Sequence, residues 1–154
     1  MDDMTIARAL HVLAIVPWIG GVAFVTLVIM PMLIRDEAPE ARLARFQQIE
    51  NGFAWQAQLW VLLAGASGLW MVWRTDMWSR FTDPGFWWMH LMVAVWLIFA
   101  VMLYVLEPLH LHKKLAASTT PAKDFAAMVR VHRILLTLSL IAVIGAVGGS
   151  HGLF

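Results

Sequence analysis

Cysteine is absent from this sequence of 154 residues. Its absence excludes disulfides, iron–sulfur clusters, thiolate catalysis and a covalently attached c-type haem. Any metal or cofactor must therefore be bound by histidine, methionine, carboxylate or backbone groups. The sequence contains six histidines and ten methionines that can serve as such ligands.

Charged side chains are also scarce. They make up 14% of the chain, whereas hydrophobic residues make up 61%, and the mean hydropathy is +0.74. A soluble domain has about 25% charged and about 45–50% apolar residues, so this composition predicts an integral membrane protein with membrane lipid as its main partner. The formal net charge of +1 excludes the strong field that a nucleic-acid partner requires.

Four long apolar runs follow one another along the chain, at residues 6–34, 53–73, 86–106 and 132–154. Each is long enough for a spanning helix, which needs roughly 20 residues. Residues 1–154 are therefore predicted to form a single all-α transmembrane domain, a four-helix up-down bundle with short connections. The first run is too long for a signal peptide, and we expect it to be tilted, or bent near Pro17 and Gly20.

Two of the connections carry helical signals of their own. Leu43, Phe46 and Ile49 recur at helical spacing and predict a short surface helix within residues 35–51. Residues 124–131 are predicted to form a helical lead-in to the last apolar run, after the break at Pro121.

Basic residues are distributed unequally between the two sides of this bundle. Eight of the eleven lie in or beside the first and third connections, and three lie on the opposite side. The positive-inside rule then places these connections in the cytoplasm and both termini outside, in a multi-pass protein of the bacterial inner membrane. The eight are Arg35, Arg42, Arg45, Lys113, Lys114, Lys123, Arg130 and Arg133, and the three are Arg8, Arg74 and Arg80.

The six histidines fall into an outer and an inner layer in this topology. The outer layer contains His11, His90 and His151, and the inner layer contains His110, His112 and His132. At 1.5 Å per residue, His90 and His112 are roughly 33 Å apart along a continuous helix. The two layers are therefore predicted to form separate sites, or none.

His11 and His90 are the main candidate ligands. A histidine inside a membrane helix is costly and usually faces the bundle interior. Two imidazoles at similar depth on different helices can ligate a six-coordinate haem iron from opposite sides. Arg8 is suitably placed to pair with a haem propionate, and His151 is a candidate hydrogen-bond donor or alternate ligand. The alternative is that these histidines only hydrogen-bond a backbone carbonyl or a hydroxyl.

The inner layer allows a second haem between His112 and His132, so the sequence predicts one or two haem b groups. The glycines fit either of two interpretations. They provide the small surfaces that a flat macrocycle needs, or they only let the helices pack closely. These glycines are Gly20, Gly21, Gly65, Gly68, Gly145, Gly148, Gly149 and Gly152.

Several short segments resemble the CopD-like and HemJ-like membrane proteins. They are Ala9-Leu10-His11-Val12-Leu13-Ala14 with Trp18-Ile19-Gly20-Gly21, Arg45-Phe46, Ala64-Gly65-Ala66-Ser67-Gly68-Leu69, and Trp87-Trp88-Met89-His90. HemJ-like proteins oxidise protoporphyrinogen and bind b-type haem, and CopD-like proteins are associated with copper handling. The resemblance implies that His11 is an axial ligand or a redox-site residue, and His90 matches the Trp-x-His start of the HemJ-like third helix in modified form. Met92 stands where that family has a basic residue, which argues against protoporphyrinogen oxidation.

These features predict a b-type cytochrome that passes electrons between quinone and an external redox partner, alone or within a larger respiratory complex. One alternative is a CopD-type copper transport or binding protein with an outer site of His11, His90 and His151, because imidazole suits copper. A HemJ-like protoporphyrinogen oxidase and a structural subunit without a cofactor are the remaining alternatives. Oxidoreductase activity is left open by the sequence.

Overall fold

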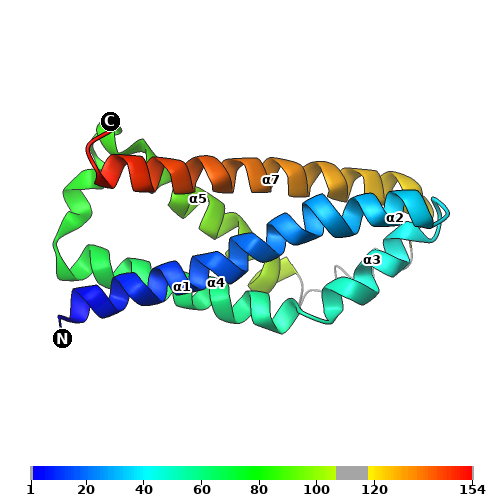
Figure 1. Ribbon diagram of the computed structural model, residues 1–154, viewed down its shortest axis with the longest axis horizontal. Helices are drawn as coiled ribbons and strands as arrows, with labels where there is room; N and C mark the ends of the chain where they lie inside the picture. Colours follow the sequence, from blue (N-terminus) through cyan, green and yellow to red (C-terminus); the bar gives the residue numbers. More distant parts are fainter. Residues whose placement is uncertain (1, 107–117, 154) are drawn as a thin grey trace.

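The computed structural model describes residues 2–106 and 118–153, and within these ranges it contains helices and no strand (Figure 1). The expected all-α class is thus confirmed. The long helices are α1 (Asp3–Phe24), α4 (Ala54–Arg74), α5 (Trp87–Val101) and α7 (Pro121–Ser150). The shorter elements are η1 (Val25–Ile29), α2 (Met30–Asp36), α3 (Arg42–Asn51), η2 (Met77–Phe81), η3 (Pro84–Phe86) and η4 (Met102–Leu106).

Three helical segments are long and apolar enough to cross a membrane, namely Asp3–Asp36, Pro84–Leu106 and Pro121–Ser150. α4 is not among them, although it has 21 residues. Gln56, Gln58 and several tryptophans make α4 less apolar than the other three segments. The structure therefore supports a membrane protein with three candidate spans and a fourth, more polar long helix.

The first segment is continuous from α1 through η1 to α2. The Asp2 side chain caps its start by accepting a hydrogen bond from the backbone N–H of Met4 at 3.2 Å. Pro17 lies inside α1, and the helix continues past it. The irregular geometry falls instead at η1, a π-helical segment in which the Thr26 hydroxyl donates to the carbonyl of Val22 at 2.6 Å.

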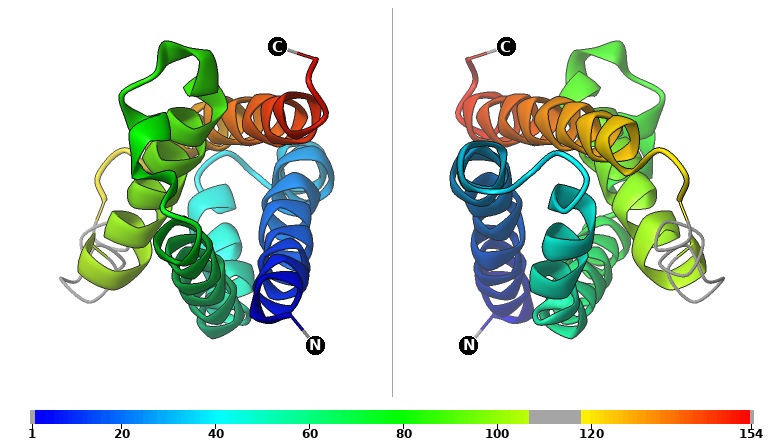
Figure 2. Two further views of the ribbon diagram at one scale, coloured as in Figure 1. Left: turned by 90° about the vertical axis from the view of Figure 1, so that its left-hand side faces the viewer. Right: turned by 90° about the vertical axis from the view of Figure 1, so that its right-hand side faces the viewer.

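Both ends of the chain lie at the same end of the molecule, on the left in Figure 1. α2, α3 and the beginning of α7 lie at the opposite end, which we call the distal end. Viewed along the long axis, the four long helices surround a common centre (Figure 2). α1 packs most extensively against α4, and α5 packs most extensively against α7.

Two clusters of buried apolar residues hold these helices together. The central cluster is drawn from all four long helices and contains Ala14, Trp18, Ile19, Val61, Ala64, Val95, Phe99, Leu135 and Leu136. The distal cluster joins η1, α2, α3 and α7 and contains Val25, Met30, Leu33, Leu43, Phe46, Phe125 and Val129. Because lipid is as apolar as these side chains, close packing rather than the hydrophobic effect is what stabilises such contacts within a bilayer.

Both connections with helical signals in the sequence form helices in the structure. The surface helix expected within residues 35–51 is α3, which buries Leu43 and Phe46 in the distal cluster. The last helix begins at Pro121, well before the apolar run at 132–154, and therefore includes the expected lead-in. Pro121 occupies the first turn of α7, where the missing N–H costs no intrahelical hydrogen bond.

Candidate functional site

His11 forms a hydrogen bond between helices that are far apart in sequence. Its Nδ1 lies 2.9 Å from the backbone oxygen of Ala64 and 3.1 Å from the hydroxyl oxygen of Ser67, both on α4. The imidazole is half-buried. The contact therefore attaches the middle of α1 to the middle of α4 at a polar point in an otherwise apolar interface.

The partners of His11 determine which ring nitrogen carries the proton. A backbone carbonyl can only accept, so Nδ1–H must be the donor to Ala64. In a neutral imidazole the lone pair then lies on Nε2, and the described residues give this atom no hydrogen-bond partner. Metal-ligating histidines have this arrangement, because the second nitrogen is anchored to a carbonyl and the first is left to bind.

The α4 segment beside His11 is shaped to receive the ring. The Ser67 hydroxyl donates to the carbonyl of Leu63 at 2.6 Å, which leaves a lone pair facing Nδ1 of His11. Gly68 completes the recess, since a Cβ at that position would lie 3.2 Å from Cε1 of His11. The small residues Ala64, Ser67 and Gly68 thus explain how an imidazole fits between two closely packed helices.

Trp18 lies on the same face of α1 as His11, because seven residues correspond to nearly two full turns. Its side chain is 7% exposed and lies in the central cluster. Its indole N–H has no hydrogen-bond partner in the described part of the chain. An unpaired buried donor costs stability, so the indole N–H of Trp18 is available to donate a hydrogen bond to a polar acceptor.

His90 occupies a different environment, at the start of α5. It is exposed, its Nε2 lies 2.9 Å from the carbonyl oxygen of Phe81, and its Nδ1 lies 3.3 Å from that of Phe86. Its ring also meets the ring of Phe81 edge to face at 5.8 Å. Both nitrogens therefore face carbonyls of the turn before α5, and no described hydrogen bond or ring contact joins His90 to His11.

His151 and Arg8 are both exposed near the end that carries the termini. Nδ1 of His151 lies 2.8 Å from the carbonyl oxygen of Val147 and 3.2 Å from the hydroxyl of Ser150, so this histidine caps the end of α7. Arg8 lies three residues before His11, and among the described residues it has no ion-pair partner. Its guanidinium is thus available to an anion.

A three-histidine metal centre is not formed by the described residues. Within residues 2–106 and 118–153, no three or more His, Asp or Glu side chains lie together in a group that could hold a metal ion. The structure therefore does not bring His11, His90 and His151 together as the copper alternative requires.

His132 belongs to the distal end. Its Nδ1 lies 3.0 Å from the carbonyl oxygen of Met128 in its own helix, and its ring meets Phe46 edge to face at 5.6 Å. His132 thus contacts α3 at the distal end, whereas His11 contacts the middle of α4, so the two histidines lie in different parts of the molecule. His110 and His112, and with them the expected pairing of His112 with His132, lie outside the described residues.

Tryptophan rings pack directly against several glycines, in the space that a larger side chain would occupy. A Cβ on Gly65 would lie 2.5 Å from the indole of Trp96, whose N–H donates to the carbonyl of Val61 at 2.8 Å. Gly145 and Gly149 on α7 are covered in the same way by Trp87 and Trp88 of α5. At these three positions glycine serves close helix packing, the second of the two interpretations offered by the sequence.

The partners of His11 are of the kind that the alternative from the sequence predicts, a backbone carbonyl and a hydroxyl. That Ala64 and Ser67 provide them was missed, and the signal for it was a serine within the small-residue run of α4. A cavity of about 450 Å³ at the distal end was also missed, although the density of arginines there gave a hint.

Comparison of the chain with protein-family models, with characterised proteins and with solved structures gave no significant match.

Proposed function

We propose that this chain is a multi-pass inner-membrane protein that binds one haem b through His11 and passes electrons between quinone and an external redox partner. The observation that carries the proposal is the state of His11. Its Nδ1–H is anchored on Ala64 and Ser67, and its Nε2 lone pair is unused. This is the arrangement that an axial haem ligand requires.

The donors near His11 support a haem more than they support copper. A haem needs one or two axial ligands, whereas the copper alternative needs several side chains that the described residues do not bring together. The unpaired indole N–H of Trp18 on the same face of α1 adds a donor for a polar group of a bound cofactor. Arg8 remains the candidate for a propionate.

His90 is the proposed second ligand, and its surroundings define what binding would require. The bonds of its ring nitrogens to Phe81 and Phe86 would have to be exchanged for iron, with a turn of the side chain. We therefore propose that His11 holds the cofactor and that His90 joins it as α5 and the preceding turn adjust. His151, which caps α7, is the alternate ligand.

A bound haem supplies one-electron redox chemistry. The protein residues orient it, keep water away from it and set its potential. Ala64 and Ser67 fix the tautomer and the rotation of the His11 ring. Within a bilayer, lipid and the apolar helices would exclude water from the half-buried His11, and its hydrogen bonds would then be stronger than in solvent.

The proposed orientation is supported by the basic residues. The described members of the larger basic group lie on α2, α3 and the first half of α7, toward the distal end. At the other end, Trp70, Trp73 and Trp78 have 44%, 61% and 49% of their side chains exposed, as expected for indoles at a membrane interface. We therefore propose that the distal end faces the cytoplasm and that the four long helices form an up-down membrane bundle.

The decisive experiment is an absorption spectrum with a haem assay on the purified protein and its His11→Ala variant. We expect about one haem per chain in the parent, and loss of the haem or of its low-spin spectrum in the variant, because an axial bond is removed. His132→Ala is the matched control, since it also removes a half-buried histidine that bonds a carbonyl. A colourless parent protein, or a His11→Ala variant with the parental haem content and spectrum, would overturn the proposal.

A further inference from the structure

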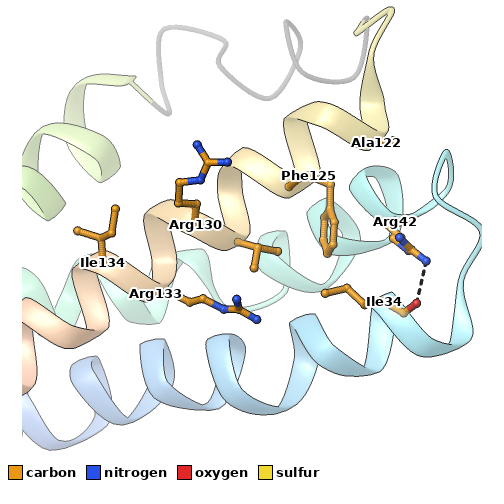
Figure 3. A pocket seen from close by; sticks show the side chains of 9 residues that line it. Ile34, Arg42, Ala122, Phe125, Arg130, Arg133 and Ile134 are labelled. Carbon is orange, nitrogen blue, oxygen red and sulfur yellow. Dashed lines mark hydrogen bonds between the residues drawn. The ribbon is translucent and has the colours of Figure 1, made fainter.

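The cavity at the distal end lies between α2, α3 and α7 (Figure 3). Its volume is about 450 Å³. Arginines from two helices line it, with Arg42 on α3 and Arg130 and Arg133 on α7, and the apolar lining includes Ile34, Phe125 and Val129. A cavity that combines cations with apolar walls suits a ligand that is itself both anionic and apolar.

No carboxylate of the described residues neutralises the positive charge in this cavity. No Asp or Glu is among the residues that line it. Arg42 donates to the backbone oxygens of Ile34 at 2.7 Å and Glu37 at 3.0 Å, which orient its guanidinium without cancelling its charge. The guanidinium groups of Arg130 and Arg133 have neither a hydrogen bond nor an ion pair to any described residue. The site therefore carries three positive charges and attracts an anion.

The surface next to the cavity continues as an apolar groove along α7. A second, shallow hollow of about 250 Å³ shares Arg133 and Ile134 with the first and extends to Thr137 and Leu138. Ile134 is 52% exposed there. The basic pocket is thus followed along α7 by about one further turn of mainly apolar surface, which suits the start of an acyl chain next to a phosphate headgroup.

The depth of the cavity in a bilayer agrees with this order. α7 has 30 residues, or about 45 Å at 1.5 Å per residue, whereas the hydrocarbon core is about 30 Å thick. If the other end of α7 lies at the opposite boundary, about ten residues protrude at the distal end. Arg130 then lies at the boundary with the lipid headgroups, and Arg133 lies about 4.5 Å further in, from where its long side chain can reach the headgroups.

We propose that this cavity is a binding site for an anionic phospholipid. Its phosphate is bound by the guanidinium groups of Arg42 and Arg133, which lie on the α2 side of the cavity in Figure 3, whereas the Arg130 side chain points up from α7, away from α2, and adds positive charge from that side. One acyl chain follows the groove along Ile134 and Leu138. Arginine suits this role because its planar fork binds phosphate oxygens in pairs. The inference depends on membrane insertion and not on haem binding.

The test is native mass spectrometry of the full-length protein released from detergent micelles, titrated with phosphatidylglycerol or with phosphatidylcholine of the same chain length. We expect the anionic lipid to bind at least tenfold more tightly than the zwitterionic one. Arg42→Gln with Arg133→Gln should reduce that preference about tenfold or more, because the charge-assisted hydrogen bonds of these two guanidinium groups to phosphate are lost. Arg80→Gln is the control, since it removes a basic residue at the opposite end and should leave the preference unchanged.

Three results would overturn the inference. They are equal binding of the two lipids, an equal loss of preference in the Arg80 control, and displacement of the anionic lipid by inorganic phosphate at an equal concentration. The last result would assign the pocket to a soluble anion. If the double variant does not fold, as judged by helical circular dichroism, the single Arg133→Gln variant decides, with an expected loss of at least threefold. The haem spectrum is recorded in parallel, so failure of either proposal is recognised separately.

Discussion

At the scale of single residues, glycine determines how closely these helices approach. Gly65 accepts the face of Trp96, and Gly68 accepts the edge of His11. Gly20, in contrast, has no atom within 4 Å of where a Cβ would stand. The same residue type therefore serves a packing contact at one position and has no such role at another.

This difference predicts the effect of two matched substitutions on stability. Gly65→Ala puts a methyl group 2.5 Å from the Trp96 ring, which its hydrogen bond to Val61 holds in place. We expect a loss of about 1–3 kcal/mol, the usual cost of overpacking. Gly20→Ala should be neutral or slightly stabilising, because alanine is the better helix former and space is free there. Thermal unfolding in one detergent measures both.

An equal fall in melting temperature for the two alanine variants would contradict this account. It would mean that Gly65 and Gly20 are both required for their backbone flexibility, and that the absence of a side chain beside Trp96 is not the deciding property of Gly65.

The histidines show which residue-scale features the sequence can predict. Counting residues along the apolar runs indicates depth, and His11 does contact Ala64 of the central cluster, whereas His132 contacts Phe46 of the distal cluster. Counting does not indicate the direction of a ring. His90 turns toward the carbonyl of Phe81 because the η2 turn folds back beside it. His11 turns toward α4 because Ala64, Ser67 and Gly68 leave room there, and their contact with it spans more than fifty residues of sequence.

At the scale of elements, α3 closes the distal end. Phe46 is 1% exposed and meets Phe125 edge to face at 6.2 Å and His132 at 5.6 Å. One side chain therefore joins α3 to two positions on α7. Its neighbour Gln48 is exposed, and within residues 2–106 and 118–153 its side chain accepts a hydrogen bond from Arg45 of the same helix and from no other residue.

Removal of the Phe46 ring should loosen this closure. We expect Phe46→Ala to destabilise the folded protein by about 3–5 kcal/mol, as is typical for a buried phenylalanine. Gln48→Ala should cost less than about 0.5 kcal/mol, because it changes an exposed position of the same helix. Limited proteolysis of the segment between α2 and α4, together with thermal unfolding, measures the effect. Equal protection of the two variants would show that α3 is held by something other than this ring.

The existence of the helices was more predictable than their ends. Apolar runs identify the long helices, because nothing else in a bilayer satisfies so many backbone groups. The apolar run alone would start α7 at residue 132, because Lys123, Asp124 and Arg130 lie in its first three turns, and the predicted lead-in at 124–131 places the start within three residues of Pro121. The π-helical segment η1 also has no signature in the residues Val25–Ile29, all of which suit an ordinary helix core in a membrane.

At the scale of the whole molecule, the arrangement of charge predicts an orientation. Both termini lie at the end opposite the distal arginines. A C-terminal fusion to a reporter that is active only in the cytoplasm should therefore give no signal. The same reporter inserted after Glu37, between α2 and α3, should be active. The reverse pattern would invert the proposed topology and place the lipid cavity at the outer leaflet.

The modest hydropathy of α4 has a consequence for how the protein is made. In the proposed topology α4 must enter the bilayer although its glutamines and tryptophans make it a poor substrate for insertion on its own. The ribosome delivers α1 first, and α1 carries the imidazole that bonds the α4 backbone. We therefore expect membrane integration of α4 to depend on α1, so that the nascent chain supplies the partner that α4 needs and the two helices enter the bilayer as a pair.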